Sequence, residues 1–170
     1  MKKVYLIAGR KRSGKDTFGA ILKEVFVNQG KSVELMSFAG PMKQILATTL
    51  DITLEKLNVL KDIPSNPHRG YLQRLGTEAT KPLFGDDVWV ALAEKAVKLS
   101  TADVVIFTDF RFPEEKLVNA TTIKVVRGNL VDDDADLHIS EQALNDFKFD
   151  ITAHNNGTIA DLTAIAKGLE

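Results

Sequence analysis

Hydrophobic positions along the chain alternate between short continuous runs and stretches with helical spacing. The run 3–8 is apolar after its first residue and stops at Gly9, which predicts a buried strand. From 15 to 29 the apolar residues recur at intervals of three and four, which places them on one stripe of a helix, and Gly30 is a suitable helix end. This part of the chain is therefore predicted to form a strand, a turn and an amphipathic helix.

The same two patterns recur along the rest of the chain. Runs that are short and apolar enough to be strands lie at 32–38, 104–107, 122–127 and 149–153. Helical spacing marks the segments 39–50, 54–60, 71–78, 88–99 and 159–169. The prolines and glycine of 62–71 predict a loop. Strands that alternate with helices in this way predict an α/β fold, with a parallel sheet and helices on both of its faces.

The composition narrows the class of protein. A chain of 170 residues with 44% apolar and 26% charged residues is typical of a single globular domain over 1–170. The net charge of −1 gives no overall attraction to nucleic acid or to an anionic membrane, so we expect neither as a partner. The absence of cysteine excludes disulfides and thiolate sites. Without an apolar run as long as a membrane span or a signal peptide, we expect a cytoplasmic protein.

The segment 9–17, Gly-Arg-Lys-Arg-Ser-Gly-Lys-Asp-Thr, carries the strongest chemical signal. It matches the pattern G-x-x-x-x-G-K between a predicted strand and a predicted helix, where this pattern forms a phosphate-binding loop. Inward-turned backbone N–H groups and the helix N-terminus attract anions, and Lys15 is expected to reach the β- and γ-phosphates. The six basic residues of 1–16, against one acid, add a local positive charge. The sequence therefore predicts nucleotide binding here.

The position after Lys15 departs from the common pattern. A serine or threonine normally stands there to bind Mg²⁺, whereas this chain has Asp16 followed by Thr17. Two interpretations stay open: Thr17 contacts the phosphates while the metal is held through water, or Asp16 itself faces the metal.

Asp109 follows the apolar run 104–107 and is expected at the carboxyl end of a buried strand. Proteins with a phosphate-binding loop hold Mg²⁺ at such a position, usually through water. Arg111 would project from the same strand end and clamp a phosphate. The alternative is that Arg111 pairs on the surface with Glu114 or Glu115.

Several segments resemble the bacteriophage deoxynucleoside monophosphate kinases. One is the loop 9–17 with its unusual Lys-Asp-Thr ending, and another is the Leu-Gln-Arg-Leu-Gly-Thr-Glu segment at 72–78. The others are 37–39, 41–43, 87–90, 109–113 with Glu115, 138–141 and 156–158. Animal phosphomevalonate kinases have a similar loop, but the central segments favour the nucleotide kinases. Lys81 stands where we expect an arginine, and Gly40 where we expect an acidic residue.

The resemblance implies a three-layer P-loop NTPase fold with a substrate-binding region at about 39–90 and a small lid at about 127–145. It also implies that ATP and Mg²⁺ are used to phosphorylate deoxynucleoside monophosphates to diphosphates by direct phosphoryl transfer. A phage origin would place the protein in the host cytoplasm. The oligomeric state stays open, with a homodimer as one option.

The resemblance also implies roles for individual residues. Those expected to bind the ATP phosphates are Arg12, Ser13, Gly14, Lys15, Asp16, Thr17 and Arg127. Those expected to bind the acceptor are Lys43, Arg69, Gln73, Arg74, Trp89 and Arg111. The catalytic residues would be Lys15, Asp109 and Arg111, and the metal residues Asp16, Thr17 and Asp109, partly through water. Trp89 could instead belong to the core, and Lys43 and Arg69 could be solvated surface charges.

The acceptor phosphate needs no general base, because it is already largely a dianion at neutral pH. Catalysis then depends on positioning and charge neutralisation. Two other functions stay open: a kinase of another phosphorylated metabolite, such as phosphomevalonate, and a nucleotide-binding regulatory module. A nucleotide-binding regulatory module would be expected to have Ser or Thr after Lys15 and an Asn-Lys-x-Asp motif that recognises the base. This chain has neither.

Overall fold

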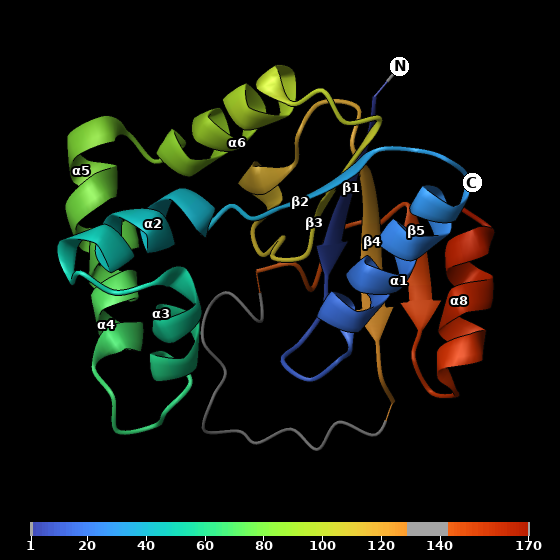
Figure 1. Cartoon of the computed structure of the whole chain (residues 1–170), viewed down its shortest axis with the longest axis horizontal. Helices are drawn as coiled ribbons and strands as arrows, with labels where there is room; N and C mark the ends of the chain where they lie inside the picture. The colour runs from blue at the N-terminus through green and yellow to red at the C-terminus, as the bar shows by residue number, and fades with distance from the viewer. Residues whose placement is uncertain (1, 129–142, 170) are drawn as a thin grey trace. The chain divides into compact units, whose positions relative to one another are not determined.

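The computed structural model describes residues 2–128 and 143–169 (Figure 1). Its strands are β1 (Lys3–Ala8), β2 (Val33–Met36), β3 (Val104–Phe107), β4 (Thr121–Val126) and β5 (Ile151–His154). They form one five-stranded sheet in the order β2-β3-β1-β4-β5, with every neighbouring pair parallel. The parallel sheet confirms the predicted α/β class and is consistent with a P-loop kinase fold.

The helices follow the predicted order closely. They are α1 (Lys15–Asn28), α2 (Gly40–Thr49), α3 (Leu54–Leu60), α4 (His68–Gln73), α5 (Thr80–Phe84), α6 (Val88–Leu99) and α8 (Ile159–Lys167). Two further helical segments are not α-helices: η1 (Arg74–Ala79) is a wider π-helix, and η2 (Pro113–Glu115) is a tighter 3₁₀-helix. The prediction was wrong at 68–71, because α4 already begins at His68 and continues through η1 into α5.

The chain divides into two compact units, one made of Met1–Met36 with Val97–Glu170 and the other of Ser37–Ala96. The first unit contains the whole sheet, and the second contains helices. The expectation of a single domain over 1–170 stays a prediction. Most of the predicted lid at about 127–145, including 138–141, lies outside the described residues.

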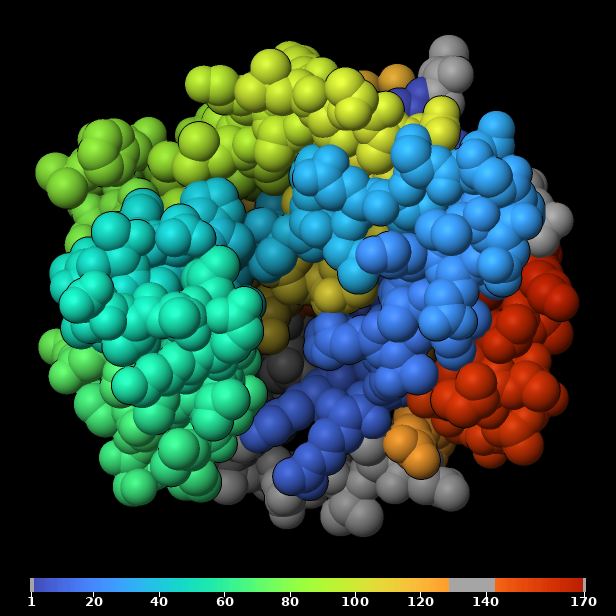
Figure 2. All heavy atoms as spheres, viewed as in Figure 1, coloured from blue at the N-terminus to red at the C-terminus, as the bar shows by residue number. Residues whose placement is uncertain are grey.

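One hydrophobic cluster of the first unit lies on one face of the sheet. Alternate residues of β1, Tyr5 and Ile7, share this face with residues of β3, β4 and β5. The apolar stripe of α1 covers them, and Leu162 and Ala166 of α8 join the same cluster. The helices α1 and α8 lie side by side (Figures 1 and 2). Because α1 is fixed by this stripe, its N-terminus stays at the carboxyl end of β1.

The strand order places two chain connections at one point of the sheet. The connection after β1 leads two positions to one side, to β2, whereas the connection after its neighbour β3 leads two positions to the other side, to β4. Adjacent strands whose connections leave in opposite directions form a switch point, where α/β proteins bind ligands at the carboxyl ends of the strands. The loop 9–14 and the segment after Phe107 both start at this point.

The second unit has its own apolar core. Leu46 and Ala47 of α2, Leu57 of α3 and Leu72 of α4 are buried together. The N-terminus of α3 is capped by Thr53, whose hydroxyl accepts a hydrogen bond from the backbone N–H of Lys56. Within residues 2–128 and 143–169, no helix has both the length and the apolar character needed to cross a membrane.

Candidate functional site

The loop between β1 and α1 has the backbone of an anion-binding turn. The N–H of Ser13 donates to the carbonyl of Arg10 at 3.0 Å, which closes the turn. Arg12 and Gly14 have φ angles of 66° and 90°, so N–H groups can point toward the inside of the loop. Gly14 precedes α1 without a capping side chain among the described residues. The first N–H groups of α1 are therefore available to an anion.

Two glycines of this loop are required by close contacts. A Cβ atom on Gly9 would lie closer than 3.0 Å to the Ser13 hydroxyl and to the carbonyl oxygen of Val125. A Cβ atom on Gly14 would lie as close to the side-chain amide of Asn155. The loop therefore bends over the end of β4, toward the turn after β5.

Ser13 has a buried hydroxyl within this loop. The residue is 1% exposed, and its Oγ has no hydrogen-bond partner within the part of the chain that the structure describes. A buried hydroxyl without a partner costs about 1–3 kcal/mol. A ligand oxygen inside the loop would remove this cost, so the loop fits a phosphate-bearing ligand.

Lys15 and Asp16 form an ion pair at the first turn of α1. The distance between Lys15 Nζ and Asp16 Oδ2 is 3.0 Å, and the two side chains are 17% and 72% exposed. The Lys15 side chain is thus largely covered, whereas the Asp16 carboxylate and the neighbouring Thr17 are open to solvent. Phosphate oxygens at the loop would compete with Asp16 for the ammonium.

The segment after β3 is held beside the end of β1. The N–H of Phe110 donates to the carbonyl of Ile7 at 3.3 Å, and Phe110 is buried against the rings of Phe147 and Phe149. Asp109, half-buried, and Arg111, exposed, flank this anchored phenylalanine. The structure therefore brings the loop after β1 and the segment carrying Asp109 to neighbouring strand ends, as the sequence predicted.

Glu115 holds the backbone of the same segment. Its Oε2 accepts hydrogen bonds from the N–H groups of Arg111 at 2.7 Å and Phe112 at 3.1 Å. Burial raises the pKa of Glu115 to about 7, and the nearby charges of Asp109 and Glu114 act in the same direction. Glu115 was named from the sequence as one of the residues that carry the resemblance and as an alternative surface partner of Arg111, and these backbone contacts were not predicted.

Arg127 follows β4 and is exposed. The next residue, Gly128, donates its N–H to Asn156 Oδ1 at 2.7 Å. Asn155 donates its side-chain N–H to the carbonyl of Ser13 at 2.8 Å. Sequence reasoning did not assign either asparagine to the site, although an Asn-Asn-Gly turn directly after a strand was a visible signal.

In the second unit, two predicted arginines lie close together in sequence but differ in their partners. Arg69 Nη2 is 2.9 Å from Asp62 Oδ1, and its Nε donates to the carbonyl of Lys61. Arg74 begins η1, and its guanidinium lies 5.5 Å from the centre of the Tyr71 ring. A shallow pocket on this helix is lined by Tyr71, Arg74, Leu75, Glu78 and Ala79.

Trp89 and Gly76 show how η1 is held. The Nε1 of Trp89 donates to the carbonyl of Gly76 at 2.9 Å. A Cβ atom on Gly76 would lie closer than 3.0 Å to the sulfur of Met42, so η1 packs directly on this side chain. Lys43 is half-buried in α2, and Gln73 is exposed at the end of α4.

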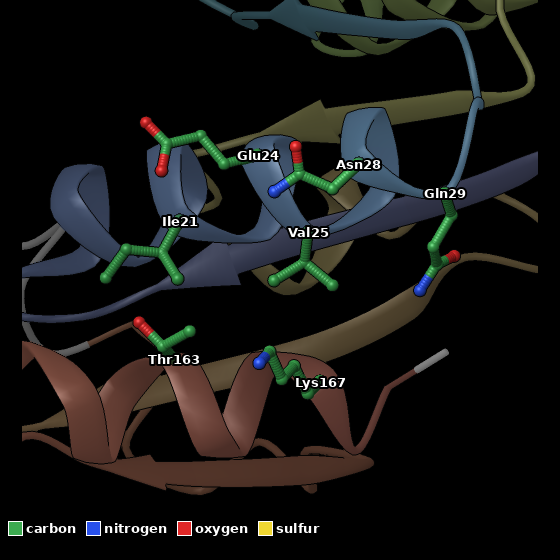
Figure 3. A pocket seen from close by; sticks show the side chains of 7 residues that line it. All are labelled: Ile21, Glu24, Val25, Asn28, Gln29, Thr163 and Lys167. Atoms are coloured by element: carbon green, nitrogen blue, oxygen red, sulfur yellow. The ribbon is translucent and has the colours of Figure 1, made fainter.

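A second pocket lies between α1 and α8 (Figure 3). It is lined by Ile21, Glu24, Val25, Asn28, Gln29, Thr163 and Lys167. None of the predicted site residues lines it, and it follows the half of α1 that points away from Lys15. Among the described residues, no three His, Asp or Glu side chains gather in a metal-binding group.

A family model described as deoxynucleotide monophosphate kinase matches residues 65–165. The chain belongs to this family. It is thus a phosphotransferase that acts on a deoxynucleoside monophosphate with a nucleotide phosphate donor. A comparison with curated proteins found no match.

The matched segment of the kinase contains half of the predicted site residues. Arg69, Arg74 and Trp89 of the second unit lie in it, as do Asp109 and Glu115 of the first. The loop 9–17 lies outside the match.

Proposed function

We propose that the kinase transfers the γ-phosphoryl group of ATP to the 5′-phosphate of a deoxynucleoside monophosphate. The products are ADP and a deoxynucleoside diphosphate. The observation that carries this proposal is the loop 9–14, with its left-handed residues, its open helix N-terminus and its buried, unpartnered Ser13 hydroxyl. These features suit the phosphates of a donor nucleotide.

On the donor side, the N–H groups of the loop and of the first turn of α1 bind the phosphates, together with Arg12, Ser13 and Gly14. Lys15 exchanges its contact with Asp16 for the β- and γ-phosphate oxygens. Because its stem is largely covered, its ammonium loses little freedom on binding. Arg127, exposed at the end of β4, adds a further positive charge on this side.

For Mg²⁺, the candidate residues are Asp16, Thr17 and Asp109. They fit this ion, which is usually held by one or two carboxylates, waters and substrate phosphates rather than by a cage of protein ligands. The Asp16 carboxylate is 72% exposed and so is open to a hydrated ion. When bound, Mg²⁺ neutralises charge on the phosphate oxygens.

On the acceptor side, we assign the phosphate to Arg74 and Arg111, with Arg69 and Lys43 as weaker candidates. Arg69 is weaker because its guanidinium already contacts Asp62. Gln73 is a candidate for the edge of the base. Trp89 acts by positioning, since its N–H is donated to the carbonyl of Gly76.

The test is an ADP-release assay with ATP and Mg²⁺ against dAMP, dCMP, dGMP and dTMP. Their ribose counterparts and phosphomevalonate serve as comparison acceptors, and a chelator tests the metal. We expect turnover with at least one deoxynucleotide, loss of turnover with the chelator, and none with phosphomevalonate. Turnover that persists without free Mg²⁺, or that needs a donor other than ATP, would contradict the proposal.

Arg111→Ala tests the assignment of the acceptor. We expect it to raise the KM of the deoxynucleotide more than the KM of ATP, because the guanidinium is placed on the acceptor phosphate. The opposite pattern would move Arg111 to the donor side. Glu114→Gln, on the neighbouring short helix η2, is the matched control for a change of charge nearby.

A further inference from the structure

The turn after β5 contacts two donor-side segments that are distant in sequence. Asn155 and Asn156 are adjacent, yet their side chains bind to different parts of the first unit. The side chain of Asn155 reaches Ser13 in the loop after β1, and that of Asn156 reaches Gly128 after β4. The strand order explains this arrangement, because β4 lies between β1 and β5 in the sheet.

The turn itself is fixed to the sheet. The backbone N–H of Asn155 donates to the carbonyl of Val126, the last residue of β4, at 2.7 Å. Three residues further, Thr158 caps α8, since its hydroxyl accepts from the N–H of Asp161 while the Asp161 carboxylate accepts from the N–H and hydroxyl of Thr158. A backbone held at both ends gives the two asparagine side chains defined positions.

The loop after β1 is shaped to meet Asn155. Neighbouring strands lie about 4.8 Å apart, so a loop above β1 must bend across β4 to contact the turn after β5. The absence of a Cβ on Gly9 lets the loop approach the carbonyl of Val125 on β4, and its absence on Gly14 leaves room for the Asn155 amide. Both glycines thus serve the same contact.

We propose that Asn155 and Asn156 are positioning residues of the donor site, with Asn155 fixing the shape of the loop 9–17 and Asn156 fixing the chain beside Arg127. Asn155 binds the carbonyl of Ser13, so the Ser13–Gly14 peptide is held with its N–H directed away from that carbonyl. Gly14 and the first turn of α1 then present their N–H groups in one direction before the nucleotide arrives. This inference rests on the proposed function of the loop as the phosphate site for ATP.

The test measures the Kd of ATP, the KM of each substrate and the melting temperature for Asn155→Ala, Asn155→Asp and Asn156→Ala. We expect Asn155→Ala to raise the Kd of ATP about five- to tenfold, as for the loss of one neutral hydrogen bond. The KM of the deoxynucleotide should change less than about twofold, because a twofold change corresponds to only about 0.4 kcal/mol. Asn155→Asp should be worse than alanine, because its carboxylate would face the carbonyl of Ser13 and repel phosphate.

Thr158→Ala is the matched control. It removes the cap of α8 in the same turn and should lower the melting temperature, but it leaves the contacts of both asparagines in place. We therefore expect an unchanged Kd for ATP. If Asn155→Ala lowers the melting temperature like Thr158→Ala and leaves the Kd of ATP unchanged, Asn155 is only structural and the inference is wrong.

A double-mutant cycle between Gly14→Ala and Asn155→Ala tests the contact itself. Removing the amide relieves the steric conflict with a new Cβ, so Gly14→Ala should weaken ATP binding less in the Asn155→Ala background. Equal losses in both backgrounds would overturn the inference. The variant Lys15→Met distinguishes a failure of this inference from a failure of the proposed function. Normal turnover in Lys15→Met would refute both the proposed function and this inference. Lost turnover in Lys15→Met, together with an unchanged Kd of ATP in Asn155→Ala, would refute this inference alone.

Discussion

Gly14 in the first unit and Gly76 in the second both lie where a Cβ atom would approach a neighbour closer than 3.0 Å, yet the neighbours differ. Gly14 has a φ of 90° and faces the Asn155 amide, which a hydrogen bond to Ser13 holds in place. Gly76 lies within η1 without a positive φ and faces the flexible thioether of Met42. The loop 9–14 is thus fixed by rigid contacts, whereas η1 rests on a side chain that can move.

Arg111 of the first unit and Arg69 of the second also differ in how firmly they are held. The backbone N–H of Arg111 is held by the half-buried carboxylate of Glu115. Arg69 instead contacts Asp62 through its side chain, and these side chains are 56% and 59% exposed. An exposed ion pair contributes little, about 0–1 kcal/mol, and gives way easily. The backbone at Arg111 is therefore held more firmly than the side chain of Arg69.

The largest effect should come from a substitution in the loop 9–17 of the first unit. Lys15→Met removes the charge placed on the β- and γ-phosphates, and we expect kcat to fall about a thousandfold while the fold is retained. Steady-state ADP release and circular dichroism measure the two properties. A variant with normal turnover would show that the loop does not bind the donor phosphates. Lys11→Met, an exposed lysine in the same loop, is the control.

The glycine comparison itself predicts unequal costs. Gly14→Ala combines a left-handed backbone with a steric conflict, so we expect it to lower the free energy of unfolding by about 2 kcal/mol or more. Gly76→Ala should change it by less than about 1 kcal/mol, because helix propensity favours alanine and Met42 can shift. Thermal unfolding measures both. Equal losses would remove the distinction between rigid and adaptable contacts.

The two arginines of the second unit should also differ. Arg74→Ala removes a charge assigned to the acceptor phosphate, and we expect the KM of the deoxynucleotide to rise about tenfold. Arg69→Ala should raise it less than about threefold, since that guanidinium is already paired with Asp62. Steady-state kinetics at saturating ATP distinguish the two. A larger effect at Arg69 would mean that its ion pair breaks on substrate binding.

The last prediction concerns the pH dependence of stability through Glu115. Its pKa is about 7 in the folded state against an ordinary value of 4.5, so the folded state binds more protons between these values. This contribution to stability is complete below about pH 4.5 and is lost as pH rises through about 7, at about 1 kcal/mol per unit.

Glu115→Gln should remove this dependence, which thermal unfolding between about pH 5 and about pH 8 would reveal. The lowered pKa values of Asp103 and Asp150 do not interfere, because both carboxyls are already ionised above their usual range. Parallel pH profiles for the wild type and the variant would show that Glu115 does not titrate in this range.

The sequence predicted the sheet and its loop well because their signals are local. Apolar runs defined β1 and β3, and the glycine spacing of 9–14 defined the turn between a strand and a helix. Neighbouring strand ends then placed Asp109 near this loop without any knowledge of side chains. The roles of the predicted site residues in binding and catalysis stay predictions.

The sequence did not predict features that depend on distant partners. The π-helix η1 interrupts a helical stretch by its backbone hydrogen bonds, for which 74–79 has no local signature. The contact of Asn155 with Ser13 spans 142 residues, and only the strand order brings these residues together. The hydrogen bonds from the backbone N–H groups of Arg111 and Phe112 to Glu115 were not predicted, because the sequence gives no signal for the backbone partners of a carboxylate.

The central position of β1 has a consequence for the synthesis of the chain. Lys3 pairs with Val104 and Tyr5 with Thr121, so both neighbours of β1 are translated about 100 residues after it. At about 5–20 residues per second, this apolar strand leaves the ribosome about 5–20 s before it has a partner. The helical second unit, with its local contacts, can fold during that time. During synthesis, β1 therefore lacks both of its neighbours in the sheet until β3 and β4 emerge.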